Sequence, residues 1–182
     1  MNVLVTGANG FIGKNLVVRL NELDINTEAY TRENSAHNFP DLLKKIDFVV
    51  HLAGENRPED EDDFELVNSG LTSLICDEIR LIEKDIPIIL ASSTQAEHDN
   101  LYGKSKLSAE IAIKNLANDT GNSAYTYRLP GVFGKWCKPN YNSVVATFCH
   151  NISHNLPIQV NDPSFELSLV YIDDVVEEFV KI

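Results

Sequence analysis

Residues 3–13 read VLVTGANGFIG, and this stretch decides the fold. An apolar run comes first, the glycines Gly7, Gly10 and Gly13 follow at every third position, and a helical pattern of apolar residues continues from Phe11 and Ile12. Glycine allows a tight turn and a close approach of the backbone to a ligand, and the N–H groups that open a helix favour an anion. The stretch predicts a strand, a phosphate-binding loop and a helix, with a flexible turn as the plainer interpretation.

The rest of the chain repeats this alternation of short apolar runs and longer amphipathic segments. Continuously apolar strands are typical of a parallel sheet covered by helices on both faces, so we predict a doubly wound α/β domain of the Rossmann type. The predicted strands are 3–5, 28–31, 48–52, 86–91 and 124–128, and the predicted helices are 11–23, one near residue 42, 64–84, 102–117 and 143–154.

A change of rhythm follows Arg128, where a loop rich in glycine and proline begins. We therefore interpret residues 1–182 as a dinucleotide-binding domain that includes the start of a substrate-binding region at about 129–182. The final residues, YIDDVVEEFVKI, have the pattern of a helix that stops at Ile182, so we expect the chain to be truncated at its C-terminus.

Composition narrows the classes of function. The formal net charge of −12 argues against a nucleic-acid surface, and no apolar run approaches the ~20 residues of a membrane span. Three widely spaced cysteines read as reduced thiols, and the sequence starts with a strand pattern, so we expect a cytoplasmic protein. We expect no metal, because His150 and His154 beside Cys149 have no further ligand nearby. A homo-oligomer remains open.

The end of the second predicted strand bears on which dinucleotide would bind. An acidic residue at that position holds a free ribose hydroxyl, whereas a cation suits a 2′-phosphate. Here the strand ends in Arg32, whose guanidinium matches a phosphate in charge and geometry, although Glu33 adjoins it. We therefore favour NADP(H) over NAD(H), and the alternative is a solvated arginine.

Ser93, Tyr102 and Lys106 form a candidate catalytic group. Tyr102 and Lys106 are one helical turn apart and share a face. Reduction of a ketone needs a hydride on carbon and a proton on oxygen, and a nearby ammonium would lower the pKa of a phenol and so activate it as an acid. A serine hydroxyl after the preceding strand would polarise the carbonyl; we choose Ser93, with Ser92 second. The alternative is an exposed helix pair beside two serines that merely end a strand.

Four motifs in order, TGANGFIG, DFVVHLAGENRP, LASSTQ and YGKSK, resemble the extended short-chain dehydrogenase/reductase family, also called the NAD-dependent epimerase/dehydratase family. The resemblance implies that Leu52, Ala53 and Gly54 line the dinucleotide opposite the glycine loop, and that Lys106 also reaches the nicotinamide ribose. Asn68 resembles a family position that orders this region, and a helix-surface asparagine is the alternative.

HLAGENRP and YRLPGVFGKWCKPNYNSVVATFC resemble one narrower group, the bifunctional capsular polysaccharide enzymes of the UDP-N-acetyl-L-fucosamine pathway. This resemblance implies NADPH-dependent reduction of the 4-keto group of a UDP-linked 6-deoxy-N-acetylhexosamine. The alternatives are a nucleotide-sugar epimerase that retains NAD and a non-catalytic dinucleotide-binding domain. The candidate contacts to the UDP-sugar are Asn56, Arg57, Arg128, Lys135, Lys138 and Asn140.

Overall fold

The computed structural model describes residues 1–31, 39–56, 60 and 64–182. The chain forms two compact units, Met1–Arg128 and Leu129–Ile182. The strands are β1 (Asn2–Thr6), β2 (Asn26–Tyr30), β3 (Phe48–His51), β4 (Ile88–Ser93), β5 (Ala124–Leu129), β6 (Gly131–Phe133) and β7 (Leu169–Tyr171). The helices are α1 (Phe11–Glu22), α2 (Phe39–Leu43), η2 (Phe64–Gly70), α3 (Leu71–Ile82), η3 (Thr94–Glu97), α4 (Leu101–Thr120), α5 (Val144–Ser153) and α6 (Ile172–Val180).

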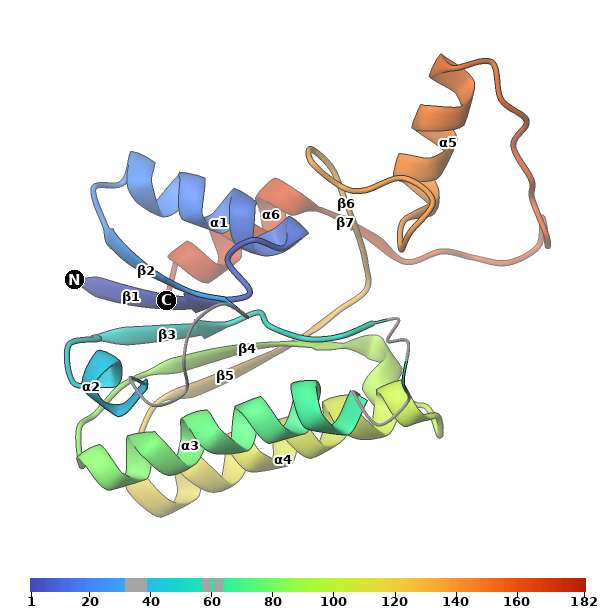
Figure 1. Ribbon diagram of the computed structural model, residues 1–182. Helices are drawn as coiled ribbons and strands as arrows, with labels where there is room; N and C mark the ends of the chain where they lie inside the picture. Colours follow the sequence, from blue (N-terminus) through green and yellow to red (C-terminus); the bar gives the residue numbers. More distant parts are fainter. Residues whose placement is uncertain (32–38, 57–59, 61–63) are drawn as a thin grey trace. The chain divides into compact units, whose positions relative to one another are not determined.

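The first unit contains a five-stranded sheet in the order β2-β1-β3-β4-β5 (Figure 1). The pairings β1 with β2, β1 with β3 and β3 with β4 are all parallel, and Val5 lies opposite Ala29 on one side and Val50 on the other. The chain leaves β1 for β2 and then returns past β1 to β3, so the order reverses between β1 and β3. Ligands of doubly wound proteins bind at such a reversal, outside the carboxyl ends of the strands.

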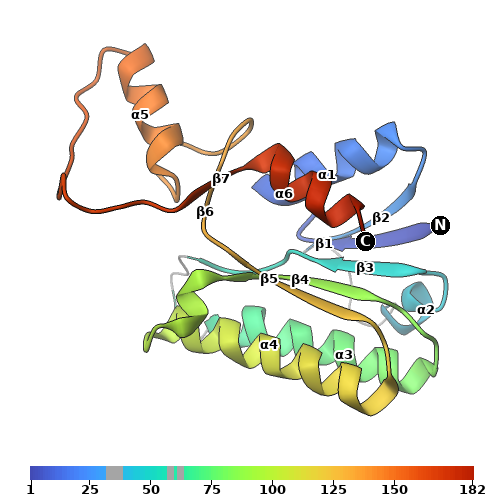
Figure 2. The same ribbon diagram turned by 180° about the vertical axis from the view of Figure 1, so that it is seen from behind.

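Helices cover both faces of this sheet. α2, α3 and α4 lie on one face and α1 lies on the other (Figures 1 and 2). Leu4 packs with the buried face of α3 and α4, including Ile79 and Ile113, in one hydrophobic cluster. Leu16 and Leu20 of α1 are buried outside that cluster. The predicted doubly wound α/β fold is therefore confirmed.

The second unit begins at Leu129 and contains a small parallel sheet of β6 and β7, with α5 between them in sequence. Sequence patterns predicted α5 and the C-terminal helix α6, but they did not predict β6 or β7, which are three residues each. The assignment of this unit to substrate binding stays a prediction. None of the helices in the described residues is long and apolar enough to cross a membrane.

One predicted helix, 64–84, is two segments of different geometry. Residues Phe64–Gly70 form a π-helix, and the α-helix starts only at Leu71. Short π-helical segments often occur at functional sites, because the wider turn changes the direction of the side chains. Here the π-helix carries Asn68, whose side chain is buried with 2% exposure. The alternative of a helix-surface asparagine is wrong.

Candidate active site

The glycine loop packs its backbone against the end of β3. Gly7 has φ +67°, and a Cβ atom at this position would lie 2.8 Å from the backbone nitrogen of Ala53. A Cβ on Gly13 would lie 2.3 Å from the carbonyl oxygen of Gly7. These contacts leave room for backbone only. The helix α1 starts at Phe11, and its N-cap residue, Gly10, offers no side chain to accept hydrogen bonds from the first turn. The N–H groups of the first turn therefore face the loop without intrahelical partners, which is the arrangement that holds a pyrophosphate.

The candidate catalytic hydroxyl groups meet beyond the end of β4. Ser93 is the last residue of β4, and its hydroxyl accepts a hydrogen bond of 3.1 Å from the backbone N–H of Gln95. Tyr102 lies in the first turn of α4, where the side chain of Asn100 caps the helix by accepting from Gly103 N–H at 2.8 Å. The side chain of Ser93 interacts with the phenol of Tyr102 and lowers its pKa against the effect of burial. This interaction brings two of the three predicted catalytic residues together.

The structure gives different partners to Ser93 and Ser92, the first and second choices for the catalytic serine. Consecutive residues of a strand point to opposite faces, and Ser92 donates a hydrogen bond of 2.5 Å to Oε1 of Glu110. The same carboxylate accepts from Arg128, with a shortest distance of 2.7 Å. Ser92 is therefore committed to a structural contact, whereas Ser93 lies with the phenol.

Lys106 is the third member of the candidate group and is buried, with 6% exposure. Its ammonium nitrogen lies 5.9 Å from the centre of the Tyr102 ring and donates to the carbonyl oxygen of Ala91 at 3.4 Å. A Cβ on Gly54 would lie 2.8 Å from the same nitrogen, so Lys106 reaches the residues that follow β3. Three motifs far apart in sequence thus converge at the carboxyl edge of the sheet.

The pKa of Tyr102 is shifted in the direction opposite to the one that its spacing from Lys106 predicts. Burial raises the pKa of Tyr102, and the interaction with Ser93 opposes this shift. The ring of Tyr102 is covered in part by Phe64, whose ring centre lies 5.8 Å away. Desolvation of the phenolate therefore sets the direction of the shift, Lys106 is not among its causes, and the phenol stays protonated at neutral pH.

Burial destabilises the charged form of Lys106, and this predicts that the free energy of unfolding depends on pH in an unusual way. Burial lowers the pKa of Lys106 from 10.5 to about 8, against the opposing charge of Glu110. Below about pH 8 the ammonium is charged in both folded and unfolded chains, so the penalty is present in full. Between about pH 8 and 10.5 the unfolded chain holds a proton that the folded chain has lost, so the free energy of unfolding rises with pH.

We therefore expect Lys106→Met to be about 2 kcal/mol more stable than the wild type at pH 7, since one pKa unit is worth ~1.36 kcal/mol. The gain should shrink as the pH approaches 10.5, the ordinary pKa of lysine. Urea unfolding at neutral and alkaline pH measures both values. Lys104→Met is the control, because Lys104 is exposed and pairs with Asp99 at the surface at 2.7 Å. A less stable Lys106→Met at pH 7 would contradict the prediction.

The candidate substrate contacts divide between the two units. In the first unit Asn56 is exposed, and Arg128 pairs with Glu97 at 2.8 Å as well as with Glu110. In the second unit the ammonium of Lys135 lies 3.0 Å from Asp173, and Lys138 lies 5.7 Å from the ring centre of Tyr141. Asn140, also in the second unit, has φ 55°. Two predicted cations, Arg32 and Arg57, lie outside the described residues.

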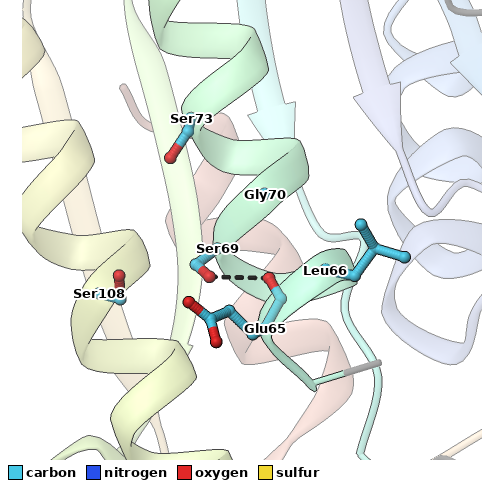
Figure 3. A pocket seen from close by; sticks show the side chains of 6 residues that line it. All are labelled: Glu65, Leu66, Ser69, Gly70, Ser73 and Ser108. Atoms are coloured by element: carbon cyan, nitrogen blue, oxygen red, sulfur yellow. Dashed lines mark hydrogen bonds between the residues drawn. The ribbon is translucent and has the colours of Figure 1, made fainter. Parts of the chain in front are cut away.

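A surface depression of about 500 Å³ lies apart from the candidate catalytic residues Ser93, Tyr102 and Lys106 (Figure 3). It is lined by residues of η2 and α3 on one side and by Ser108 of α4 on the other, and the hydroxyl of Ser69 donates to the carbonyl oxygen of Glu65 at 2.7 Å. None of the candidate catalytic residues lines it. In the described residues no three histidine, cysteine or acidic side chains gather as a metal site would require.

Sequence reasoning missed three buried polar residues beneath the site: Thr6, His51 and Thr72, which are 0–1% exposed. His51 falls within the predicted strand 48–52, and the sequence pattern does not indicate its partners. The available signal was a polar side chain that directly follows an apolar run, VLV before Thr6 and FVV before His51. Such a residue is buried at the sheet edge and needs hydrogen-bond partners.

Comparison with known proteins agrees with this geometry. The model of the NAD dependent epimerase/dehydratase family matches residues 3–182. The chain belongs to this family. The resemblance that the four sequence motifs indicated is thus confirmed.

Two relatives within this family are similar over the whole chain. The UDP-2-acetamido-2,6-beta-L-arabino-hexul-4-ose reductase of Pseudomonas aeruginosa strain PA103 is 52% identical over 183 residues, which cover 100% of this chain and 49% of that protein. The crystal structure of the capsular polysaccharide assembling protein CapF from Staphylococcus aureus is 46% identical, with a TM-score of 0.88 over 100% of this chain and 49% of the other. The chain therefore spans about half the length of these relatives.

A more distant structure shares the fold. MoeE5 in complex with UDP-glucose and NAD is 24% identical, with a TM-score of 0.86 over 99% of this chain and 71% of the other. This chain thus has the Rossmann-type architecture of epimerase/dehydratase proteins.

Proposed function

We propose that this chain reduces the 4-keto group of a UDP-linked 6-deoxy-N-acetylhexosamine with NADPH, in the synthesis of precursors for capsular or other surface polysaccharides. The observation that carries the proposal is the grouping of Ser93, Tyr102 and Lys106 at the carboxyl edge of the sheet, where the Lys106 ammonium lies 5.9 Å from the centre of the Tyr102 ring. The relative with 52% identity is named as a reductase of a UDP-linked 4-keto sugar, which supports the substrate class.

The residues present fit a dinucleotide. The backbone cradle at Gly7 and Gly13 has no space for a Cβ, and the N-terminus of α1 presents N–H groups to a pyrophosphate. Gly7, Gly10, Phe11, Ile12 and Gly13 would hold the phosphates, and Leu52, Ala53 and Gly54 would line the opposite side. When bound, the dinucleotide supplies the hydride that reaches the carbonyl carbon.

The protein supplies the proton and the polarisation. The hydroxyl of Ser93 donates a hydrogen bond to the carbonyl oxygen and so favours negative charge there. Tyr102 transfers its phenolic proton to the same oxygen, which completes the alcohol. Lys106 then stabilises the phenolate by its charge until a proton returns from solvent. The raised pKa of Tyr102 suits this direction, because the protonated phenol is the competent acid.

Two finer parts of the proposal concern the dinucleotide and the compartment. We assign NADPH rather than NADH on the basis of Arg32 at the end of the second predicted strand. We place the reaction in the cytoplasm, and the free thiols of Cys76, Cys137 and Cys149 are in keeping with a reducing compartment.

A direct assay tests the reaction. We expect this chain, or any longer version of it, to oxidise one NADPH per UDP-4-keto-6-deoxy-N-acetylhexosamine, measured by the absorbance of reduced nicotinamide. NADH should be a poorer donor, because the cation at position 32 favours a 2′-phosphate. UDP-N-acetylglucosamine, which has no ketone, is the control and should consume none. Dinucleotide that stays bound in equal amount through purification, with sugar conversion but no net NADPH use, would instead indicate an epimerase.

A further inference from the structure

A chain of buried side-chain hydrogen bonds runs through His51 at the end of β3. Nδ1 of His51 lies 2.6 Å from the hydroxyl oxygen of Thr6, and Nε2 lies 2.8 Å from the hydroxyl oxygen of Thr72. All three residues are 0–1% exposed. β1, β3 and α3 are therefore joined by one imidazole ring, away from water.

The partners determine which ring nitrogen carries the proton. The hydroxyl of Thr72 donates its proton to the carbonyl oxygen of Asn68 at 2.6 Å, so toward His51 it accepts from Nε2–H. Nδ1 consequently accepts from the hydroxyl of Thr6. Burial, followed by the charge of Lys106, lowers the pKa of His51 to about 3, so the ring is neutral in a single tautomer at physiological pH.

The hydrogen bonds on the Nδ1 side of His51, called here the Thr6 arm, support the dinucleotide cradle. The hydroxyl oxygen of Thr6 also accepts from the backbone N–H groups of Leu52 and Ala53, each at 3.1 Å. Thr6 precedes Gly7, whose Cα packs against Ala53 with no room for a side chain. The bond from Thr6 to His51 therefore fixes the strand end from which the glycine loop departs.

The hydrogen bonds on the Nε2 side of His51, called here the Thr72 arm, support α4, the helix that carries Tyr102. Thr72 holds the backbone of Asn68, and the side-chain amide of Asn68 donates to Glu55 O and to Ser105 Oγ, each at 3.0 Å. The hydroxyl of Ser105 in turn donates to the backbone oxygen of Tyr102 at 2.9 Å. A displacement of Thr72 would therefore be transmitted through Asn68 and Ser105 to the first turn of α4, which carries Tyr102.

We propose that His51 is a positioning residue that sets the dinucleotide cradle and the Tyr102 helix in one geometry, through opposite nitrogens of its ring. The proposal rests on the proposed function for its effect on turnover, and its effects on dinucleotide binding and on Tyr102 are independent of turnover. His51 acts through Thr6 and Thr72, so each arm has its own consequence.

Two substitutions separate the arms. The amide of asparagine reaches the position of Nδ1, and that of glutamine reaches the position of Nε2. We expect His51→Asn to keep the Thr6 arm, with an unchanged Kd for NADPH and a kcat lowered about tenfold. We expect His51→Gln to keep the Thr72 arm, with a Kd weakened about tenfold and a nearly unchanged kcat at saturating NADPH. Nicotinamide fluorescence measures Kd, and the ketosugar assay measures kcat.

A turnover-independent measurement protects the test if the proposed reaction is wrong. The phenol titration of Tyr102, taken as the ultraviolet difference between each protein and its Tyr102→Phe counterpart, should shift in His51→Asn and not in His51→Gln. His98→Asn and His98→Gln are the matched controls, because His98 is exposed, and they should change none of these values.

Folding is checked by circular dichroism, and if a His51 variant does not fold, Thr6→Val and Thr72→Val repeat the experiment with little change in shape. Thr6→Val should weaken NADPH binding and Thr72→Val should shift the Tyr102 titration. Variants that change binding and titration together by the same factor, or change neither, would overturn the proposal.

Discussion

Replacing Tyr102 by phenylalanine should lower the kcat of ketosugar reduction by about 10³, because general acid catalysis by a positioned side chain contributes roughly 10²–10⁴. Phenylalanine keeps the ring, and with it the contact to Phe64 at 5.8 Å, while it removes only the hydroxyl group. The Kd of NADPH should therefore stay within about twofold of the wild-type value. Steady-state kinetics with the ketosugar and fluorescence titration with NADPH measure the two quantities.

Tyr125→Phe provides the comparison for this substitution. Tyr125 lies on β5 with 38% exposure, outside the candidate site, so its loss of a hydroxyl should leave kcat unchanged. A Tyr102→Phe variant that reduces the ketosugar at the wild-type rate would remove Tyr102 from the reaction. An equal fall in both variants would point to a general effect on folding, which thermal unfolding would reveal.

The regular elements could be predicted because local periodicity reflects burial on one or both faces. The helix that starts at Phe11 and the strand that ends with His51 were expected to within one or two residues. The π-helical turn before Leu71 could not be predicted from the spacing of apolar residues. This turn is held by the buried hydrogen bonds of Asn68 with Glu55 and Ser105, which spacing does not reveal. Sequence spacing reports which face is buried, and it does not report what the buried groups contact.

The catalytic candidates were accessible from sequence for a similar reason. Tyr102 and Lys106 share a helical face by their spacing, and Ser93 ends a strand that precedes this helix. The pKa of Tyr102 was not accessible, since it depends on how much protein covers the phenol. The ion pair of Arg128 with Glu110 was not accessible either, because it requires β5 to lie beside α4.

Gly13→Ala should have the second large effect, on binding and on stability together. The new Cβ would lie 2.3 Å from Gly7 O and 2.8 Å from the Cα of Ala8, and both are backbone atoms that cannot move by rotating a side chain. α1 must shift away from the loop, at a cost of about 3 kcal/mol, which is typical of overpacking in a tight core. Because the atoms that must move belong to the glycine loop, we expect the Kd of NADPH to rise about a hundredfold. Urea unfolding and fluorescence titration measure the two effects.

Gly70→Ala is the matched control, because it adds the same methyl group to a helical glycine in open surroundings. The nearest atom to its Cβ would be Glu65 O at 3.6 Å, an ordinary contact, and alanine favours a helix by roughly 0.5–1 kcal/mol over glycine. Gly70→Ala should thus be as stable as the wild type or slightly more stable, with unchanged NADPH affinity. A Gly13→Ala protein that bound NADPH as tightly as this control would show that the glycine loop does not hold the dinucleotide, and the proposed reaction would lose its source of hydride.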